Sequence, residues 1–213
     1  FMGGHSVRDE EIKLGYSITG TVSVRDIKQN SGAMSGDRIV LTKRLGTGLI
    51  TTALKKGEPN PAHVREAIKS MCLLNRKASE IAVRHNVHAM TDVTGFGLVG
   101  HSLEVARASN LSIEIDHRQL PVFDGALEYS RRGYCAGGLE SNRSYYGRHV
   151  RFTDGVPQEY SDLVFDPQTS GGLLMFVSES DSTGLIEDLL REDQIAALIG
   201  RTMDRNPDVL SII

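Results

Sequence analysis

VHAMTDVTGFGLVGHSLEVARAS, residues 87–109, contains the change of periodicity that decides the fold class. Its first part, 87–93, is a short run that ends beside an aspartate and is typical of a strand. Its second part, 96–109, has the apolar pattern of a helix with one buried face. DVTGFG (92–97) lies between them and predicts a glycine-bearing turn. Strands that alternate with helices in this way predict an α/β or α+β layered domain.

The alternation extends on both sides of this stretch. We expect further strands at 15–24, 37–43, 111–116 and 195–203, and helices at 45–57, 61–85, 123–132 and 180–191. The 61–85 pattern places Cys72 on a buried face. RDIKQNSGAMSGD (25–37) predicts a linker or boundary loop, and residues 133–160 predict a long irregular loop. Two apolar runs within 163–179 are separated by DPQTSGG, which by its chemistry alone is a turn between strands.

The composition excludes several classes of protein. Hydrophobic residues make up 39% of the 213 residues and charged residues 24%, as in a soluble globular protein. A net charge of −3 without a basic run argues against nucleic acid and against a membrane surface as partners. Cys72 and Cys135 form neither a CxxC pair nor a disulfide framework, so we expect a cytoplasmic protein. The histidines lack the paired spacing of a zinc site.

Three stretches place glycines beside hydroxyls or acids: GGHS (3–6), DVTGFG (92–97) and DPQTSGG (166–172). Glycines let backbone N–H groups approach an anion, and a helix that follows favours negative charge. Asp92 has two interpretations. By local pattern alone it is a turn or helix-capping residue. A strand-end carboxylate is also a suitable oxygen ligand for Mg²⁺ beside a phosphate.

Neither common nucleotide fingerprint is convincing. No stretch matches the Walker pattern GxxxxGK[ST]. GFGLVG (95–100) spells G-x-G-x-x-G, but the second strand offers only Asp116 as the expected acidic residue. A generic dinucleotide-binding protein is therefore the function that the motifs favour least.

Taken together, five segments resemble the selenophosphate synthetase (selenide, water dikinase) family. They are GGHSVRDEEIKLGYSITG, GDRIVLTKRLGTGLITTALKKG, HAMTDVTGFGLVGHSLEVA, GGLESNRSYY and DPQTSGGLL, in that order along essentially the whole chain. The resemblance implies the fold of aminoimidazole ribonucleotide synthetase. By this resemblance, residues 1–28 are a remnant of an N-terminal, β-rich domain for ATP binding and dimerisation, and residues 29–213 are the C-terminal α/β domain.

The resemblance also implies an activity and its site. Family members convert ATP, selenide and water to selenophosphate, AMP and orthophosphate, with Mg²⁺ as cofactor, in a homodimer whose subunits share the ATP site. Asp92 matches an aspartate that holds Mg²⁺. Gly3, Gly4 and His5 match a segment that contacts ATP from the partner subunit. The positions that match other site-shaping parts of these motifs are Thr94, Gly95, Asn142, Thr169 and Ser170.

The chain departs from the family pattern at several positions. The family's catalytic cysteine or selenocysteine and its lysine precede every segment matched here, so no residue of this chain is assigned as catalytic. Cys135 and Ala136 replace residues before the GG of one motif, and Arg44 stands where proline is usual. We expect a chain that begins inside a larger protein and makes no selenophosphate by itself.

The sequence leaves two further functions open. One is that of a different ATP-dependent synthetase of the same superfamily, such as a purine-pathway enzyme that acts on an amide. The second is that of a non-catalytic fragment or paralogue that serves dimerisation or partner binding.

Overall fold

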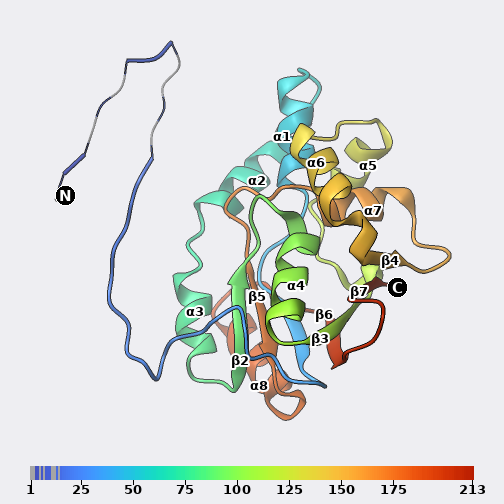
Figure 1. Ribbon diagram of the computed structural model, residues 1–213. Coiled ribbons are helices and arrows are strands. Elements are labelled where there is room, and N and C mark those ends of the chain that lie inside the picture. Colours follow the sequence, from blue (N-terminus) through green and yellow to red (C-terminus); the bar gives the residue numbers. More distant parts are fainter. Residues whose placement is uncertain (1–2, 5, 7, 11–12, 14) are drawn as a thin grey trace.

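A mixed sheet with helices on both faces forms the body of the protein (Figure 1). The computed structural model describes residues 3–4, 6, 8–10, 13 and 15–213. The strands are β1 (Arg38–Leu41), β2 (Val87–Asp92), β3 (Leu111–Ile115), β4 (Val150–Phe152), β5 (Leu173–Val177), β6 (Ala197–Asp204) and β7 (Leu210–Ile212). The helices are α1 (Thr47–Lys55), α2 (Pro61–Cys72), α3 (Arg76–Ala82), α4 (Gly97–Ala108), α5 (Ala126–Arg131), α6 (Gly137–Tyr146), α7 (Gln158–Phe165) and α8 (Glu179–Arg191).

The strand order places β2 at one edge of the sheet. The order is β2-β5-β1-β6-β3-β7-β4. The pairs from β2 through β3 are antiparallel, whereas β7 pairs in parallel with both β3 and β4. In the register of the first pair, Asp92 lies opposite Leu173. The last residue of β2 therefore lies beside the start of β5, directly after DPQTSGG.

Each face of the sheet has its own core. Side chains of a strand alternate between faces, so Leu174 and Phe176 of β5 join the larger core, while Met175 and Val177 join the smaller one. The larger core includes residues of α1, α4, α5, α6 and α7, and the smaller one residues of α3 and α8. Figure 1 shows α8 on the side of the sheet away from α4.

The layered α/β prediction is confirmed, and so are the strands and helices around 87–109. The prediction of one irregular loop over 133–160 is wrong, since these residues contain α6, β4 and the start of α7. The helix expected over 61–85 is interrupted after Cys72 and resumes at Arg76. Leu73 is extended there, and its carbonyl accepts a hydrogen bond from the Lys43 ammonium at 2.7 Å. A tertiary contact thus overrides the helical pattern.

Two more expectations are wrong. Cys72 is exposed, because α2 lies at the margin of the core and only Ala67 in it is fully buried. Residues 15–24 form no strand in the described structure; they are exposed and lie away from the body (Figure 1). An isolated strand has no partner for its backbone groups, and the described part of the chain supplies none here.

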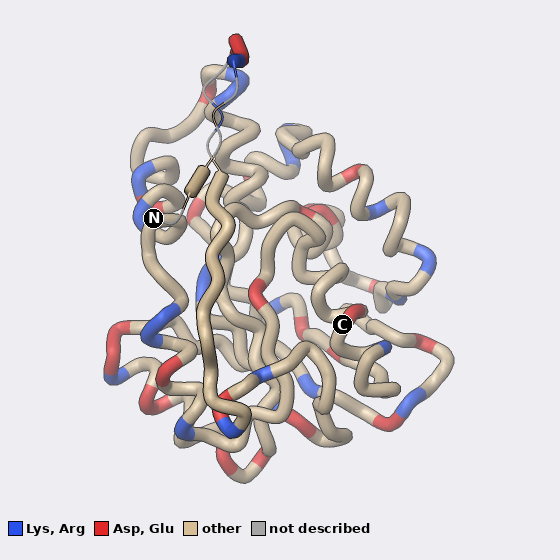
Figure 2. The backbone as a smooth tube through the Cα atoms, turned by 60° about the vertical axis from the view of Figure 1, so that its left-hand side comes forward, with Lys and Arg blue, Asp and Glu red and all other residues tan. Residues whose placement is uncertain are grey.

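Charged residues of both signs are interspersed along the backbone in Figure 2, without a large region of one sign on the side shown. Among the described residues, no helix combines the length and the apolar character that a membrane span requires.

Candidate functional site

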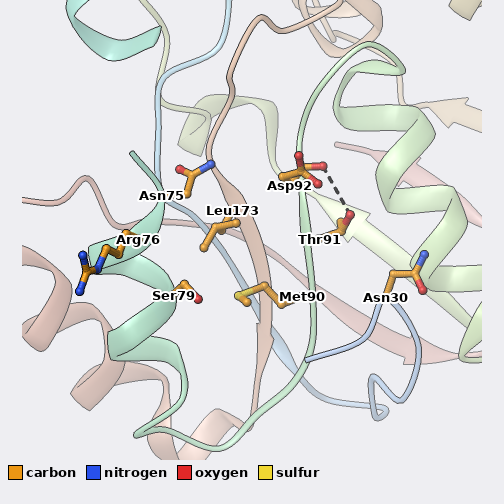
Figure 3. Close-up of a pocket in the computed structure, with 8 residues that line it drawn as sticks. All are labelled: Asn30, Asn75, Arg76, Ser79, Met90, Thr91, Asp92 and Leu173. Carbon is orange, nitrogen blue, oxygen red and sulfur yellow. Dashed lines mark hydrogen bonds between the residues drawn. The ribbon is translucent and has the colours of Figure 1, made fainter. Parts of the chain in front are cut away.

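Asp92 lines a cavity of about 540 Å³ at the edge of the sheet. It shares this cavity with Met90 and Thr91 of its own strand and with residues of three other segments: Asn30, Asn75, Arg76, Ser79 and Leu173. In Figure 3 the start of α3 forms one wall, β2 forms the opposite wall and Leu173 lies between them. The Arg76 side chain points away from Asp92, and its guanidinium pairs with Glu80 instead (Figure 3).

The Asp92 carboxylate does not cap α4. The N-cap position of that helix is Phe96, which has no side-chain capping hydrogen bond. Asp92 is exposed, and its carboxylate has no hydrogen bond or ion pair among the residues that the structure describes; only its backbone carbonyl accepts a weak contact from Thr91 at 3.4 Å. The capping interpretation is therefore wrong, and the carboxylate is free to bind a ligand in the cavity.

The turn after Asp92 is fixed by the DPQTSGG loop. The N–H of Val93 donates to the carbonyl of Gly172 at 2.9 Å, and the N–H of Gln168 donates to the carbonyl of Thr94 at 3.0 Å. Gly171 is required at this junction, because a Cβ there would lie 2.0 Å from the Val93 carbonyl oxygen. Two motifs that are separated in sequence thus form one unit.

The same loop is held from its other side. The buried ammonium of Lys43 donates to the carbonyl of Ser170 at 2.8 Å, and the side-chain amide of Asn75 donates to that of Gly171 at 2.9 Å. Burial lowers the pKa of Lys43. Ser170 itself has φ +50°, a conformation uncommon for a side chain other than glycine. The contacts on both sides keep this strained loop beside Asp92.

Asp166 accepts hydrogen bonds from backbone N–H groups at the N-terminus of α1. Its buried carboxylate accepts hydrogen bonds from the N–H groups of Gly48 and Leu49 at 3.0 and 3.3 Å, and from the Gln168 amide at 3.0 Å. The side-chain oxygen of Gln168 accepts the N–H groups of Gly46 and Thr47. Burial raises the pKa of Asp166 to about 7, although these donors favour the ionised form. LGTG therefore binds an internal carboxylate rather than an external anion.

The remaining residues expected at the site divide into two groups. Asn142 is structural: its amide donates to the carbonyls of Gly95 and Phe165 at 2.9 and 3.0 Å and so joins α6 to both loops. Thr169 and Ser170 are exposed at the tip of the DPQTSGG loop. Neither is a lining residue of the Asp92 cavity.

The N-terminal motif is not brought to Asp92. Gly3 and Gly4 are exposed, and a Cβ at either would have nothing within 4 Å. Figure 1 shows their segment away from the α/β body. His5 lies outside the described residues. The assignment of these three to ATP stays a prediction.

Asp92 fits a partial Mg²⁺ site. The described residues contain no group of three or more His, Cys, Asp or Glu side chains arranged to hold a metal. Mg²⁺ keeps several waters and is commonly bound through one or two carboxylates and substrate phosphates. One exposed carboxylate that has no partner among the described residues meets part of that requirement, and Asn30 and Asn75 line the same cavity.

Sequence reasoning missed Asn75. A helical pattern across 61–85 concealed it, although asparagine between two apolar helical runs is a recognised start signal for a second helix. Here its side chain does not cap α3 but holds Gly171.

A dinucleotide fold is excluded by the topology. That fold requires neighbouring parallel strands joined by a helix. β2 and β3 flank α4 in sequence, but β5, β1 and β6 separate them in the sheet. Asp116 instead caps the short 3₁₀ turn His117–Gln119 and pairs with Arg118.

Comparison with known proteins identifies the family to which the chain belongs. The family model for the AIR synthase related protein, C-terminal domain, matches residues 34–212. A selenide, water dikinase of Treponema denticola is 38% identical over 215 residues, which cover 99% of this chain and 60% of that protein. One of Caldanaerobacter subterraneus subsp. tengcongensis is 42% identical, covering 95% of this chain and 59% of that protein. The chain thus spans about three-fifths of the length of these relatives.

Solved structures share the fold at lower identity. Thiamine-monophosphate kinase from Stenotrophomonas maltophilia K279a superposes with a TM-score of 0.60 at 19% identity, over 87% of this chain and 52% of that one. Hydrogenase maturation protein HypE in complex with ATP gives 0.58 at 17% identity, over 86% and 47%. At these identities the likeness concerns the fold alone.

Proposed function

Because this chain belongs to the AIR synthase related family and carries its C-terminal domain, we propose that it is the C-terminal part of a selenide, water dikinase. The observation that supports this most directly is the joined pair of loops, DVTGFG and DPQTSGG, which leaves the Asp92 carboxylate unpaired at a cavity. The proposed reaction converts ATP, selenide and water to selenophosphate, AMP and orthophosphate. The selenophosphate is the selenium donor for selenocysteine and selenouridine synthesis. We place it in the cytoplasm.

Asp92 would hold Mg²⁺ in this reaction. When bound, Mg²⁺ neutralises charge on phosphate oxygens during phosphoryl transfer. The contribution of this chain is positioning. The hydrogen bonds of Val93 and Gln168 fix the turn on both sides of the carboxylate, and Gly171 allows the two loops to touch. Since a displacement of about 1 Å can cost roughly a hundredfold in rate, this support is essential to the proposed role.

We further propose a homodimer that shares the ATP site, with Gly3, Gly4 and His5 contacting ATP bound by the partner subunit. Residues 15–24 support such an assembly. Tyr16, Ile18, Val22 and Val24 alternate with small hydroxyl residues and are 61–90% exposed, so one face of this segment is apolar and uncovered. An exposed segment in which apolar and hydroxyl residues alternate is suited to join a sheet.

The test uses the whole protein that carries this sequence. Asp92→Asn should reduce selenide-dependent AMP formation from ATP by at least about a hundredfold, with selenophosphate followed by ³¹P NMR. Asp204→Asn is the matched control, because Asp204 is also an exposed aspartate at the end of a strand and lies outside the Asp92 cavity. Equal activity of the two variants would contradict the assignment of Asp92.

Binding by residues 1–213 alone gives a second measurement. One carboxylate without a second acidic partner binds Mg²⁺ weakly, so titration calorimetry with Mg²⁺ and ATP should detect only weak association. Tight association that Asp92→Asn abolishes would show that the described residues already contain a complete site, against this proposal.

A further inference from the structure

A second cavity, of about 470 Å³, lies at the end of α2. None of its lining residues lines the Asp92 cavity. Its wall includes the buried ring of Phe123 together with Leu73 and Ile195. Cavities of this size are typical of sites for small molecules, which combine apolar walls with a small number of polar groups, and here the apolar wall lies beside charged side chains.

Two neighbouring cations, Lys43 and Arg44, line this cavity, and neither has a carboxylate partner among the described residues. Lys43 is only 3% exposed, and its ammonium donates to the carbonyls of Leu73 and Ser170 at 2.7 and 2.8 Å. An ammonium has three donors, so one remains without a protein acceptor among the described residues. Arg44 is half-buried and has no hydrogen bond or ion pair from its side chain in the described structure.

The acidic residues of the cavity do not neutralise this pair. Glu66 and Asp193 line it, but both are exposed, as is the third cation, Lys69. Charges in contact with water are strongly screened, whereas those in a buried position are not. The inner part of the cavity is therefore positive and its rim is mixed. Burial of a cation without a counter-ion is costly, and the lowered pKa of Lys43 agrees with that cost.

We propose that this cavity binds a small organic anion, with its charged group at Lys43 and Arg44 and its apolar body against Phe123 and Leu73. An anionic group supplies the missing acceptor to the ammonium and a partner to the guanidinium. The apolar body covers the aromatic and aliphatic wall. The site is distinct from the Asp92 cavity, because the two share no lining residue, although Lys43 also holds the carbonyl of Ser170 in the loop beside Asp92.

Cys72 provides a direct readout, since it is exposed and lines this cavity. Phenyl phosphate is the probe, and its occupancy should slow alkylation of Cys72 by iodoacetamide in a saturable manner. Cys135 serves as an internal reference, because burial raises the pKa of its thiol to about 11 and it should react slowly throughout. Mass spectrometry of the intact full chain follows both thiols.

The charge requirement is tested by variants and by analogues. Arg44→Gln should weaken the protection by about tenfold or more, while Arg84→Gln, the same change at an exposed arginine after α3, should leave it unchanged. Benzyl alcohol, which lacks the charge, and inorganic phosphate, which lacks the apolar body, should protect poorly. Protection of Cys72 by benzyl alcohol equal to that by phenyl phosphate, full protection in Arg44→Gln, or no protection by phenyl phosphate would each overturn the proposal.

Discussion

Gly171→Ala should separate the two loops that position Asp92. The added Cβ would lie 2.0 Å from the carbonyl oxygen of Val93 and 3.2 Å from the Cβ of Gln168. Since carbon and oxygen atoms do not approach within about 3 Å without repulsion, one loop must move by about 1 Å. The φ of Gly171 is not in the left-handed region, so the effect would come from contact and not from backbone strain.

The energetic cost follows from the contacts at the junction. Overpacking of this kind costs about 1–3 kcal/mol. Displacement of the loops also weakens the hydrogen bond from Val93 to Gly172 or the one from Gln168 to Thr94, at about 1 kcal/mol each. We therefore expect a loss of about 2–4 kcal/mol in the free energy of unfolding. Urea denaturation followed by circular dichroism measures it.

Gly137→Ala is the matched control. Gly137 begins α6, and a Cβ there would meet nothing within 4 Å, so the control should change the unfolding free energy by less than about 0.5 kcal/mol. In the whole protein, Gly171→Ala should also lose selenide-dependent AMP formation at temperatures where it remains folded. A Gly171→Ala variant as stable and as active as Gly137→Ala would refute the steric reasoning.

Three further predictions concern single side chains. Burial raises the pKa of Asp166 from 3.8 to about 7, so its contribution is present at low pH and lost as pH rises through about 7. Between pH 5.5 and 8.5, the unfolding free energy of the wild type should fall by about 2 kcal/mol more than that of Asp166→Asn, as measured by urea titration. The same dependence of unfolding free energy on pH in both proteins would contradict the raised pKa of Asp166. Asp181 shows the opposite sign: the N–H of Asn86 and the His85 ring lower its pKa, so Asp181→Asn should lose less stability than the wild type on acidification, measured as melting temperature at about pH 5 and about pH 3. Asn142→Ala leaves two carbonyls without their donor and should cost about 2–4 kcal/mol by denaturant titration, a loss under 1 kcal/mol being incompatible with its bridging role.

The local sequence was sufficient to predict a helix or strand where the periodicity of its apolar residues matches their burial in the structure. The β2–turn–α4 unit was predicted because the apolar residues of both parts, such as Ala89 and Leu103, face one core. The same reasoning failed for α6, whose sequence GGLESNRSYY is mostly polar. Only Leu139, Asn142 and Tyr146 of that helix are buried. Its position depends on the Asn142 hydrogen bonds to distant loops, which no local pattern contains.

The candidate site was partly predictable for the same reason. Asp92 stands at the end of a recognisable strand, so its place at a strand end followed from the sequence, whereas the position of β2 at the edge of the sheet did not. That its carboxylate has no partner in the described structure could not be predicted from the sequence, because an aspartate before a glycine turn and a helix usually predicts a helix cap. Asp92 does not take that role, since Phe96, four residues later, occupies the N-cap position.

LGTG and DVTGFG look alike in the sequence, as glycine-bearing turns that lead into helices, yet they differ in what reaches them. At α1, the N–H groups of Gly48 and Leu49 are accepted by Asp166, which lies 118 and 117 residues away along the chain. A carboxylate at a helix N-terminus is favoured by the helix dipole, so this start of a helix no longer offers a site for an external anion. At β2 the carboxylate belongs to the turn itself and has no partner in the described chain. Only the second arrangement leaves a charge available to a ligand. Because the difference depends on Asp166, which is remote in the sequence, it can be recognised only from the three-dimensional structure.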